Sequence, residues 1–322
     1  MENTWTPEPC LKPHRKCCGY KAFWFAGVLL IFQHVAFTQH LHNFYPDTLN
    51  KKRLTGLIIT ETIAYSATMA GLYQLWYKNY PSSSFHFIND NQEWLLMDKA
   101  GHATTAYYLG RINYNALRWA GVKDKKAVWY GGASGLLFVT TIEVFDGFSK
   151  EWGASTGDII ANTSGALLFV SQQLLWKDQR FTLKYSFHPS EYADYNPELL
   201  GKNTLQQAIK DYNGQTFWLS ANIKSFIRRD SRFPSWLNIA FGYGAEGMTG
   251  AGSNPVSIDG TPIPPSERYR QFYLSPDIDL TRIKVKSNFL KVVFTLIGFI
   301  KIPLPTLEYN KENNFVFHWV YF

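Results

Sequence analysis

Hydrophobic residues recur at helical spacing through the first half of the chain beyond residue 50. The pattern predicts four long helices, at 54–78, 90–119, 125–146 and 155–176. The spacing Ser155-x-x-Asp158 is typical of a capping box at the start of the fourth helix, and Gly147 follows the end of the third. Each predicted helix is long enough to cross a bilayer, but polar residues interrupt each one. A bundle with inward-facing polar groups fits this pattern.

The second half of the chain alternates apolar and polar residues, which is typical of half-buried strands. We expect strands at 181–187, 237–243, 269–279, 306–309 and 315–322. Residues 204–211 and 217–228 are expected to be helical, and 289–300 to form a short apolar helix in the core or at a membrane interface. The predicted fold class is α+β: an N-terminal four-helix bundle followed by a β-rich half of about five antiparallel strands.

The N-terminus has the organisation of a secretory signal. Four basic residues precede the apolar run Ala22–Phe32, and small residues follow it near Thr38. Eleven apolar residues are too few for a membrane span, which needs about 20. We expect cleavage near Thr38, with an uncleaved signal anchor as the alternative. The predicted organisation is a signal peptide at 1–38, a helical domain at 39–178 and a β-rich domain at 179–322.

Composition narrows the class of protein. The chain has 322 residues, of which 46% are hydrophobic and 17% aromatic, and this excludes intrinsic disorder. The three cysteines, Cys10, Cys17 and Cys18, all precede the apolar run, so they form neither a disulfide scaffold nor a lipobox. The balance of 32 Lys and Arg against 25 Asp and Glu is mildly basic, and without a recognition motif it argues against nucleic acid as a partner. We expect an exported protein in the periplasm or outer membrane of a Gram-negative bacterium.

Three pairs of polar residues form the candidate site. One pair lies on each of the last three predicted helices: Asp98 with His102, Glu143 with Asp146, and Asp158 with Asn162. The spacings i, i+3 and i, i+4 place each pair on one helix face. In an up-down bundle the starts of the second and fourth helices share an end with the finish of the third. We therefore expect the three pairs to converge.

Three kinds of role are open to such a cluster. Carboxylates and an imidazole on facing helices can bind a metal, or hold a carboxylic acid of raised pKa for general acid–base catalysis. Alternatively, the cluster is an inert polar lock in which Lys99, Lys150 and the indole N–H of Trp152 satisfy the carboxylates. Asp158 can also simply close its helix start. The sequence implies no cofactor, leaves the metal unknown and leaves the question of an enzyme open.

A family resemblance rests on these residues. The motif Asp98-Lys99-Ala-Gly-His102, with the segment from Glu143 to Gly165, resembles the YfiM-type family of predicted periplasmic lipoproteins, domain of unknown function 2279. The same polar set is similar to the VanZ-like membrane domain. The resemblance covers residues 90–176 and implies an exported or membrane-linked helical domain, but no reaction. The chain departs from the lipoprotein members by lacking a lipobox, which puts its mode of membrane attachment in doubt.

Aromatic residues gather near the predicted helix ends and in the last strand, where rings suit a membrane–water boundary. The last strand, 315–322, is apolar on both faces, so it either faces lipid or is covered on both sides. About five strands fall short of the eight that a bacterial outer-membrane barrel needs. We expect an outer-membrane-associated envelope protein, in envelope assembly or maintenance, with membrane lipid as a partner and protein partners unknown. The alternative is a membrane-linked enzyme or binder that acts on a lipid or cell-wall precursor through the polar cluster.

Overall fold

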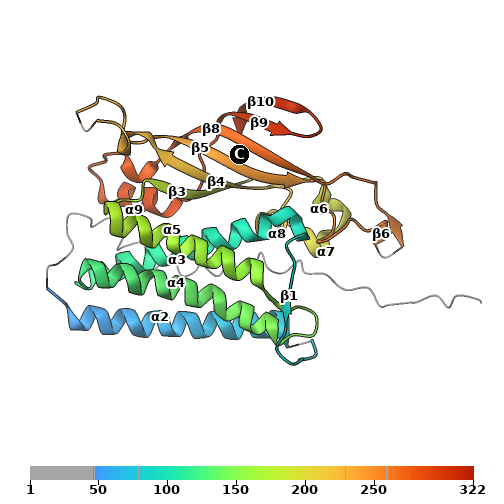
Figure 1. Cartoon of the computed structure of the whole chain (residues 1–322), viewed down its shortest axis with the longest axis horizontal. Coiled ribbons are helices and arrows are strands. Elements are labelled where there is room, and N and C mark those ends of the chain that lie inside the picture. Colours follow the sequence, from blue (N-terminus) through green and yellow to red (C-terminus); the bar gives the residue numbers. More distant parts are fainter. Residues whose placement is uncertain (1–45, 47, 79, 229, 259) are drawn as a thin grey trace, which may run out of the picture.

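The computed structural model describes residues 46, 48–78, 80–228, 230–258 and 260–322, so the predicted signal peptide lies outside the described residues. The chain forms two layers, with long helices on one side and a sheet on the other (Figure 1). The α-helices are α2 (Lys51–Leu72), α3 (Met97–Trp119), α4 (Asp124–Gly147), α5 (Thr156–Trp176), α6 (Tyr192–Tyr195), α7 (Pro197–Leu200), α8 (Thr204–Lys210) and α9 (Asn288–Ile297). The strands are β1 (Phe87–Ile88), β2 (Ala154–Ser155), β3 (Phe181–Phe187), β4 (Gln215–Asn222), β5 (Leu237–Glu246), β6 (Ser257–Ile258), β7 (Thr261–Pro262), β8 (Tyr269–Ile278), β9 (Leu304–Asn310) and β10 (Asn314–Tyr321). A π-helical turn, Tyr73–Tyr77, extends α2, and single 3₁₀ turns lie at η3 (Glu93–Leu96), η4 (Ile223–Ser225) and η5 (Leu280–Arg282).

The long helices pack closely because small residues line their contacts. A Cβ atom added to Gly165 of α5 would lie 2.0 Å from the carbonyl oxygen of Ala103 in α3. One added to Gly135 of α4 would lie 2.6 Å from the backbone nitrogen of Gly110 in α3. α3 is therefore the central helix, with α4 and α5 against its backbone and α2 on the side away from the sheet (Figure 1).

The mixed helix-and-sheet class is confirmed, but a self-contained four-helix bundle is not. Four further α-helices follow in the second half of the described chain. One hydrophobic core also joins the two layers: Trp94 and Tyr107 belong to the same buried cluster as Tyr185 and Phe217 of the sheet. The division of the chain at residue 178 stays a prediction.

The second long helix starts later than the predicted residue 90. Trp94, Leu95 and Leu96 have φ values of 49°, 51° and 72°, so the regular helix α3 begins at Met97. The indole of Trp94 is buried against Tyr212, and its backbone N–H donates to the carbonyl oxygen of Ala251. Tertiary contacts thus override the local helix signal here.

The large sheet has six antiparallel strands in the order β10-β9-β8-β5-β4-β3. The predicted helix at 217–228 is wrong, because its first half belongs to β4. Phe217 pairs with Tyr185 of β3 on one side and with Tyr243 of β5 on the other. Only a short 3₁₀ turn, η4, follows it. The extra strand completes the central part of the sheet.

The sheet curls around a polar interior. The hydroxyl of Tyr321 in β10 lies 3.1 Å from the hydroxyl of Thr216 in β4, although three strands separate β10 and β4 in the sheet order. Lys184 and Asp277 form an ion pair of 2.7 Å on the same concave face, and both side chains are buried. Burial lowers the pKa of the neighbouring Lys301 to about 8. Buried charges are costly unless they are paired, so this face is a closed polar network.

Candidate functional site

The start of α5 positions the centre of the polar cluster. The hydroxyl of Ser155 accepts a hydrogen bond from the backbone N–H of Asp158 at 3.0 Å, as an N-cap does. In a capping box the side chain of Asp158 would return to the Ser155 N–H, but Glu143 of α4 takes that place at 2.9 Å. The Asp158 carboxylate therefore points elsewhere, toward Lys99 and His102. Capping alone does not explain this residue.

His102 is held in a defined orientation among the acidic groups. Its Nδ1 lies 3.0 Å from the side-chain oxygen of Asn162. In the tautomer that carries its proton on Nδ1, the ring donates this hydrogen bond to the amide oxygen. The other ring nitrogen, Nε2, lies 3.9 Å from Glu143 Oε1 and 3.8 Å from Asp158 Oδ1. The ring therefore directs Nε2 at two carboxylates.

Lys99 connects the other acidic side chains. Its ammonium nitrogen lies 2.6 Å from Asp90, 2.8 Å from Asp98 and 3.0 Å from Asp158. Asp90 also accepts a hydrogen bond from the Ser155 hydroxyl. The sequence predicts Asp90 only as the start of a helix. The left-handed turn before α3 places it in the cluster instead, and no local sequence pattern predicts that turn.

The structure brings five of the six predicted site residues together and places the sixth elsewhere. Asp146, one helical turn beyond Glu143, accepts a hydrogen bond of 2.7 Å from the hydroxyl of Tyr77. Of the three groups expected to satisfy the carboxylates, Lys99 does so. Lys150 is exposed, and the indole of Trp152 packs edge-on against Tyr77 and Tyr80.

The cluster is enclosed. Asp158 is 0% exposed, Glu143 1% and His102 8%. Groups buried to this degree either pair with one another or hold a cation, because an isolated buried charge is strongly disfavoured. The arrangement fits a polar lock, and it also fits a site at which three ligand atoms converge within 4.8 Å.

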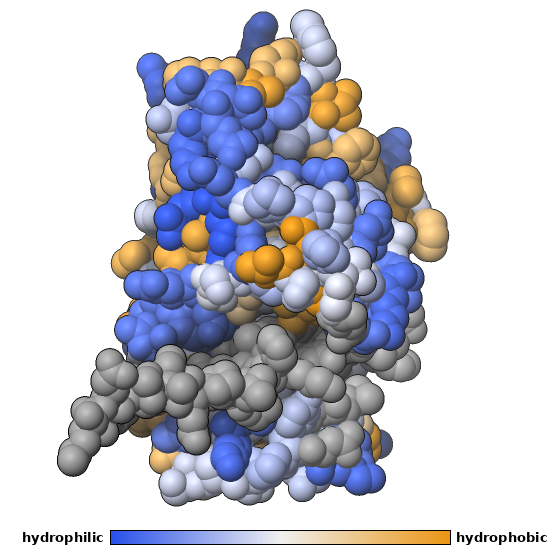
Figure 2. Space-filling model, turned by 90° about the vertical axis from the view of Figure 1, so that its right-hand side faces the viewer, coloured by the Kyte–Doolittle hydropathy of each residue, from blue (hydrophilic) through white to orange (hydrophobic). Residues whose placement is uncertain are grey.

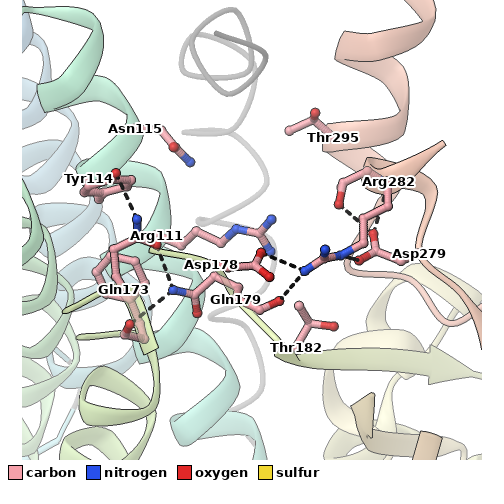
Figure 3. A pocket seen from close by; sticks show the side chains of 12 residues that line it. Arg111, Tyr114, Asn115, Gln173, Asp178, Gln179, Thr182, Asp279, Arg282 and Thr295 are labelled. Carbon is pink, nitrogen blue, oxygen red and sulfur yellow. Dashed lines mark hydrogen bonds and ion pairs between the residues drawn. The ribbon is translucent and has the colours of Figure 1, made fainter. Parts of the chain in front are cut away.

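A second polar site is a cavity of about 230 Å³ between α3, α5, η5 and α9 (Figure 3). Arg282 forms ion pairs with Asp178 at 2.7 Å and with Asp279 at 3.2 Å, and also donates to the backbone oxygen of Gln179. The side chain of Arg111 reaches from α3 into the same space (Figure 3). The guanidinium of Arg282 therefore joins two carboxylates inside the fold.

The third candidate is an apolar surface, here called the outer face of the sheet. It consists of Leu219, Ile239, Phe241, Phe272, Leu274, Leu307, Tyr309, Phe315, Phe317 and Trp319, all of which are exposed. Strand register aligns these residues, since Phe241 pairs with Leu274 and Leu274 with Leu307. The helices cover the same face at β3 and β4. Among the described residues the face is also covered at Tyr243 and Ala245 of β5, whereas Phe241 and the apolar residues named above on β8, β9 and β10 are exposed, so β10 is not covered on both sides.

Comparison with known proteins supports the predicted family. Residues 86–172 match the family model described as "Predicted periplasmic lipoprotein (DUF2279)". The matched segment runs from β1 to α5 and contains all six predicted site residues. The match does not extend to the YfiM-type name or to the VanZ-like pattern, which stay predictions. No curated protein and no solved structure matches the chain.

The family description agrees with the predicted localisation. The chain is an exported protein of the cell envelope, in the periplasm or at the outer membrane. The description assigns no reaction to the family.

Proposed function

We propose that this protein is an outer-membrane-associated component of the envelope whose outer face contacts lipid. The observation that carries this proposal is the inversion of the sheet, which keeps charged groups such as Asp277 inside and apolar side chains such as Phe272 and Leu274 outside. Along β8, for example, Tyr273 and Asp277 are buried while Phe272 and Leu274 are exposed. In a sheet that has only water around it, the alternation normally runs the other way. Outward apolar and inward polar residues suit a lipid environment.

The helices and the basic residues beside α9 support the same proposal. Large apolar side chains are exposed on the outer stripes of α4 and α5: Trp129, Leu137, Val144, Ile160, Leu167 and Leu175. Within the described residues one helix, α4, is long and apolar enough to cross a membrane, and 44% of its most apolar stretch is buried. Lys284 and Lys286 precede the amphipathic helix α9 and Lys291 lies in its first turn, beside the exposed Phe289 and Leu290, and this arrangement suits an interface with anionic headgroups.

Water-facing surface remains at one end of the molecule. The end near β1 and β6 is mostly hydrophilic, with smaller hydrophobic areas among the polar residues (Figure 2). A protein with one polar end and an apolar sheet face is built to sit at a bilayer with that end in water. This placement leaves room for a role in envelope assembly or maintenance.

Flotation of the purified full-length chain with phosphatidylethanolamine–phosphatidylglycerol vesicles tests the proposal. We expect the protein to float with the vesicles and to stay bound after a high-salt wash, since the contact is mainly apolar and salt screens only charge. Recovery of the protein in the salt-washed soluble fraction would contradict lipid contact.

A second candidate function is a membrane-linked enzyme or binder that acts on a lipid or cell-wall precursor through Asp98, His102, Glu143, Asp158 and Asn162. The convergence of these side chains favours it. The test is complementation of a deletion strain by His102→Ala, read as resistance of the envelope to detergent. If the variant is present at wild-type amounts in the membrane fraction yet fails to complement, the cluster has a chemical role. Full complementation would indicate that the cluster is an inert polar lock.

A further inference from the structure

We propose that His102, Glu143 and Asp158 bind one divalent transition-metal ion of the zinc class. The inference is independent of lipid contact, because it concerns the interior of the helical layer. It rests on the geometry of three ligand atoms, on how neighbouring groups orient them, and on the charge of the surrounding side chains.

The three ligand atoms are of the kinds and at the spacing that such an ion requires. His102 Nε2, Glu143 Oε1 and Asp158 Oδ1 all lie within 4.8 Å of one another, and the two distances from the ring nitrogen are 3.9 and 3.8 Å. Around a tetrahedral zinc ion, with bonds of about 2.0–2.2 Å, ligand atoms lie about 3.4 Å apart. The two distances from the ring nitrogen would therefore have to shorten by about half an ångström. Imidazole with two carboxylates suits zinc or manganese better than calcium.

Groups outside the ligand set hold the ligands in place. Asn162 contacts Nδ1 and so orients the ring with Nε2 toward the two carboxylates. The backbone N–H of Ser155 holds the second oxygen of Glu143, which leaves Oε1 directed at the ring. A metal-binding histidine and carboxylate commonly have such partners. The amide nitrogen of Asn162 is also buried and has no hydrogen-bond partner within the described residues.

The charge of the cluster favours a cation between these residues. Asp90 and Asp98 add two carboxylates to those of Glu143 and Asp158, and Lys99 contributes one ammonium group beside them. A divalent ion between the ring and the two ligand carboxylates would add positive charge among these acidic groups. The alternative occupant of the same position is a proton on Nε2, which makes an imidazolium ion paired with both carboxylates.

Zinc titration of the full-length protein in mild detergent tests the proposal. Cys10, Cys17 and Cys18 are replaced by serine so that thiols cannot bind the metal, and the protein is first treated with a chelator. We expect one zinc ion per chain by calorimetry, together with a rise in the midpoint of thermal unfolding. Glu143→Gln and His102→Ala are each expected to weaken binding by at least 100-fold, since each removes one of three protein ligands.

The matched control is Asp146→Asn. It changes a buried carboxylate on the same helix, one turn from Glu143, that binds Tyr77 and not the ring. We expect unchanged zinc affinity from this variant. If a variant of the ligand set unfolds, Co²⁺ replaces zinc in the otherwise native chain, and visible absorption bands that zinc abolishes report the site. Absence of stoichiometric zinc binding and of these bands would overturn the proposal in favour of the imidazolium, as would equal affinity in folded Glu143→Gln.

Discussion

Removal of three rings from the last strand should detach the protein from lipid. Phe315, Phe317 and Trp319 expose 68%, 53% and 79% of their surface. For side chains of roughly 150–250 Å² this amounts to about 400 Å² of exposed ring. At about 25 cal/mol per Å², full transfer of that area into lipid contributes about 10 kcal/mol. Transfer of only a quarter contributes about 2.5 kcal/mol, or a factor of about 70 in partitioning, because about 1.4 kcal/mol corresponds to a tenfold change.

The assay compares vesicle partition coefficients of the wild type and a triple serine variant, Phe315→Ser with Phe317→Ser and Trp319→Ser. The side chains replaced are exposed, so we expect the free energy of unfolding in detergent to change little. Val256→Ser is the control, since Val256 is 86% exposed beside β6, at the end that we place in water. An unchanged partition coefficient in the triple variant would refute the assignment of the outer face to lipid.

Three further predictions concern stability and are read from denaturant unfolding. Lys184→Met is expected to destabilise the fold by about 3–5 kcal/mol, because it removes the cation that pairs with buried Asp277. The additional substitution Asp277→Leu is expected to recover most of this loss, and a stable single variant would argue against the ion pair. Gly165→Ala is expected to lower the free energy of unfolding by about 1–3 kcal/mol, because its Cβ would lie 2.0 Å from a backbone oxygen. Gly56→Ala in α2, whose Cβ would have nothing within 4 Å, is expected to raise it by about 0.5–1 kcal/mol. Equal effects of the two substitutions would contradict the close helix approach. Burial lowers the pKa of Lys301 from 10.5 to about 8, so the unfolded chain binds this proton more tightly than the folded one. The stability of the wild type should therefore rise between pH 8 and 10.5 relative to that of Lys301→Met. Parallel pH profiles of the two proteins would refute this.

Much of the polar cluster was predictable because helix geometry is periodic. The spacing of Asp98 and His102 fixes their common face, and the short link between α4 and α5 fixes the direction of the next helix. The spacing could not reveal that Glu143 would replace Asp158 as the partner of the Ser155 N–H, since that choice depends on contacts between α4 and α5.

The sheet was less predictable because its pattern is inverted. Around Trp218 the apolar residues run together, since this ring packs on the polar face and donates to the hydroxyl of Ser186, so the segment reads as helix. The end of β10 departs from the sequence pattern for a different reason. A shift of register between His318 and Tyr321 turns Tyr321 to the buried face, where strict alternation would place it beside Phe317.

The most direct test of the central claim is the depth of the outer face in a bilayer. With Cys10, Cys17 and Cys18 replaced by serine, a single cysteine introduced by Phe317→Cys carries an environment-sensitive fluorophore, and the protein is bound to vesicles with quenchers at known acyl-chain depths. Lys311→Cys, in the exposed turn between β9 and β10, is the control. We predict strong quenching from acyl-chain positions at 317 and little at 311. Equal quenching by a water-soluble quencher at both positions would contradict lipid contact by the outer face.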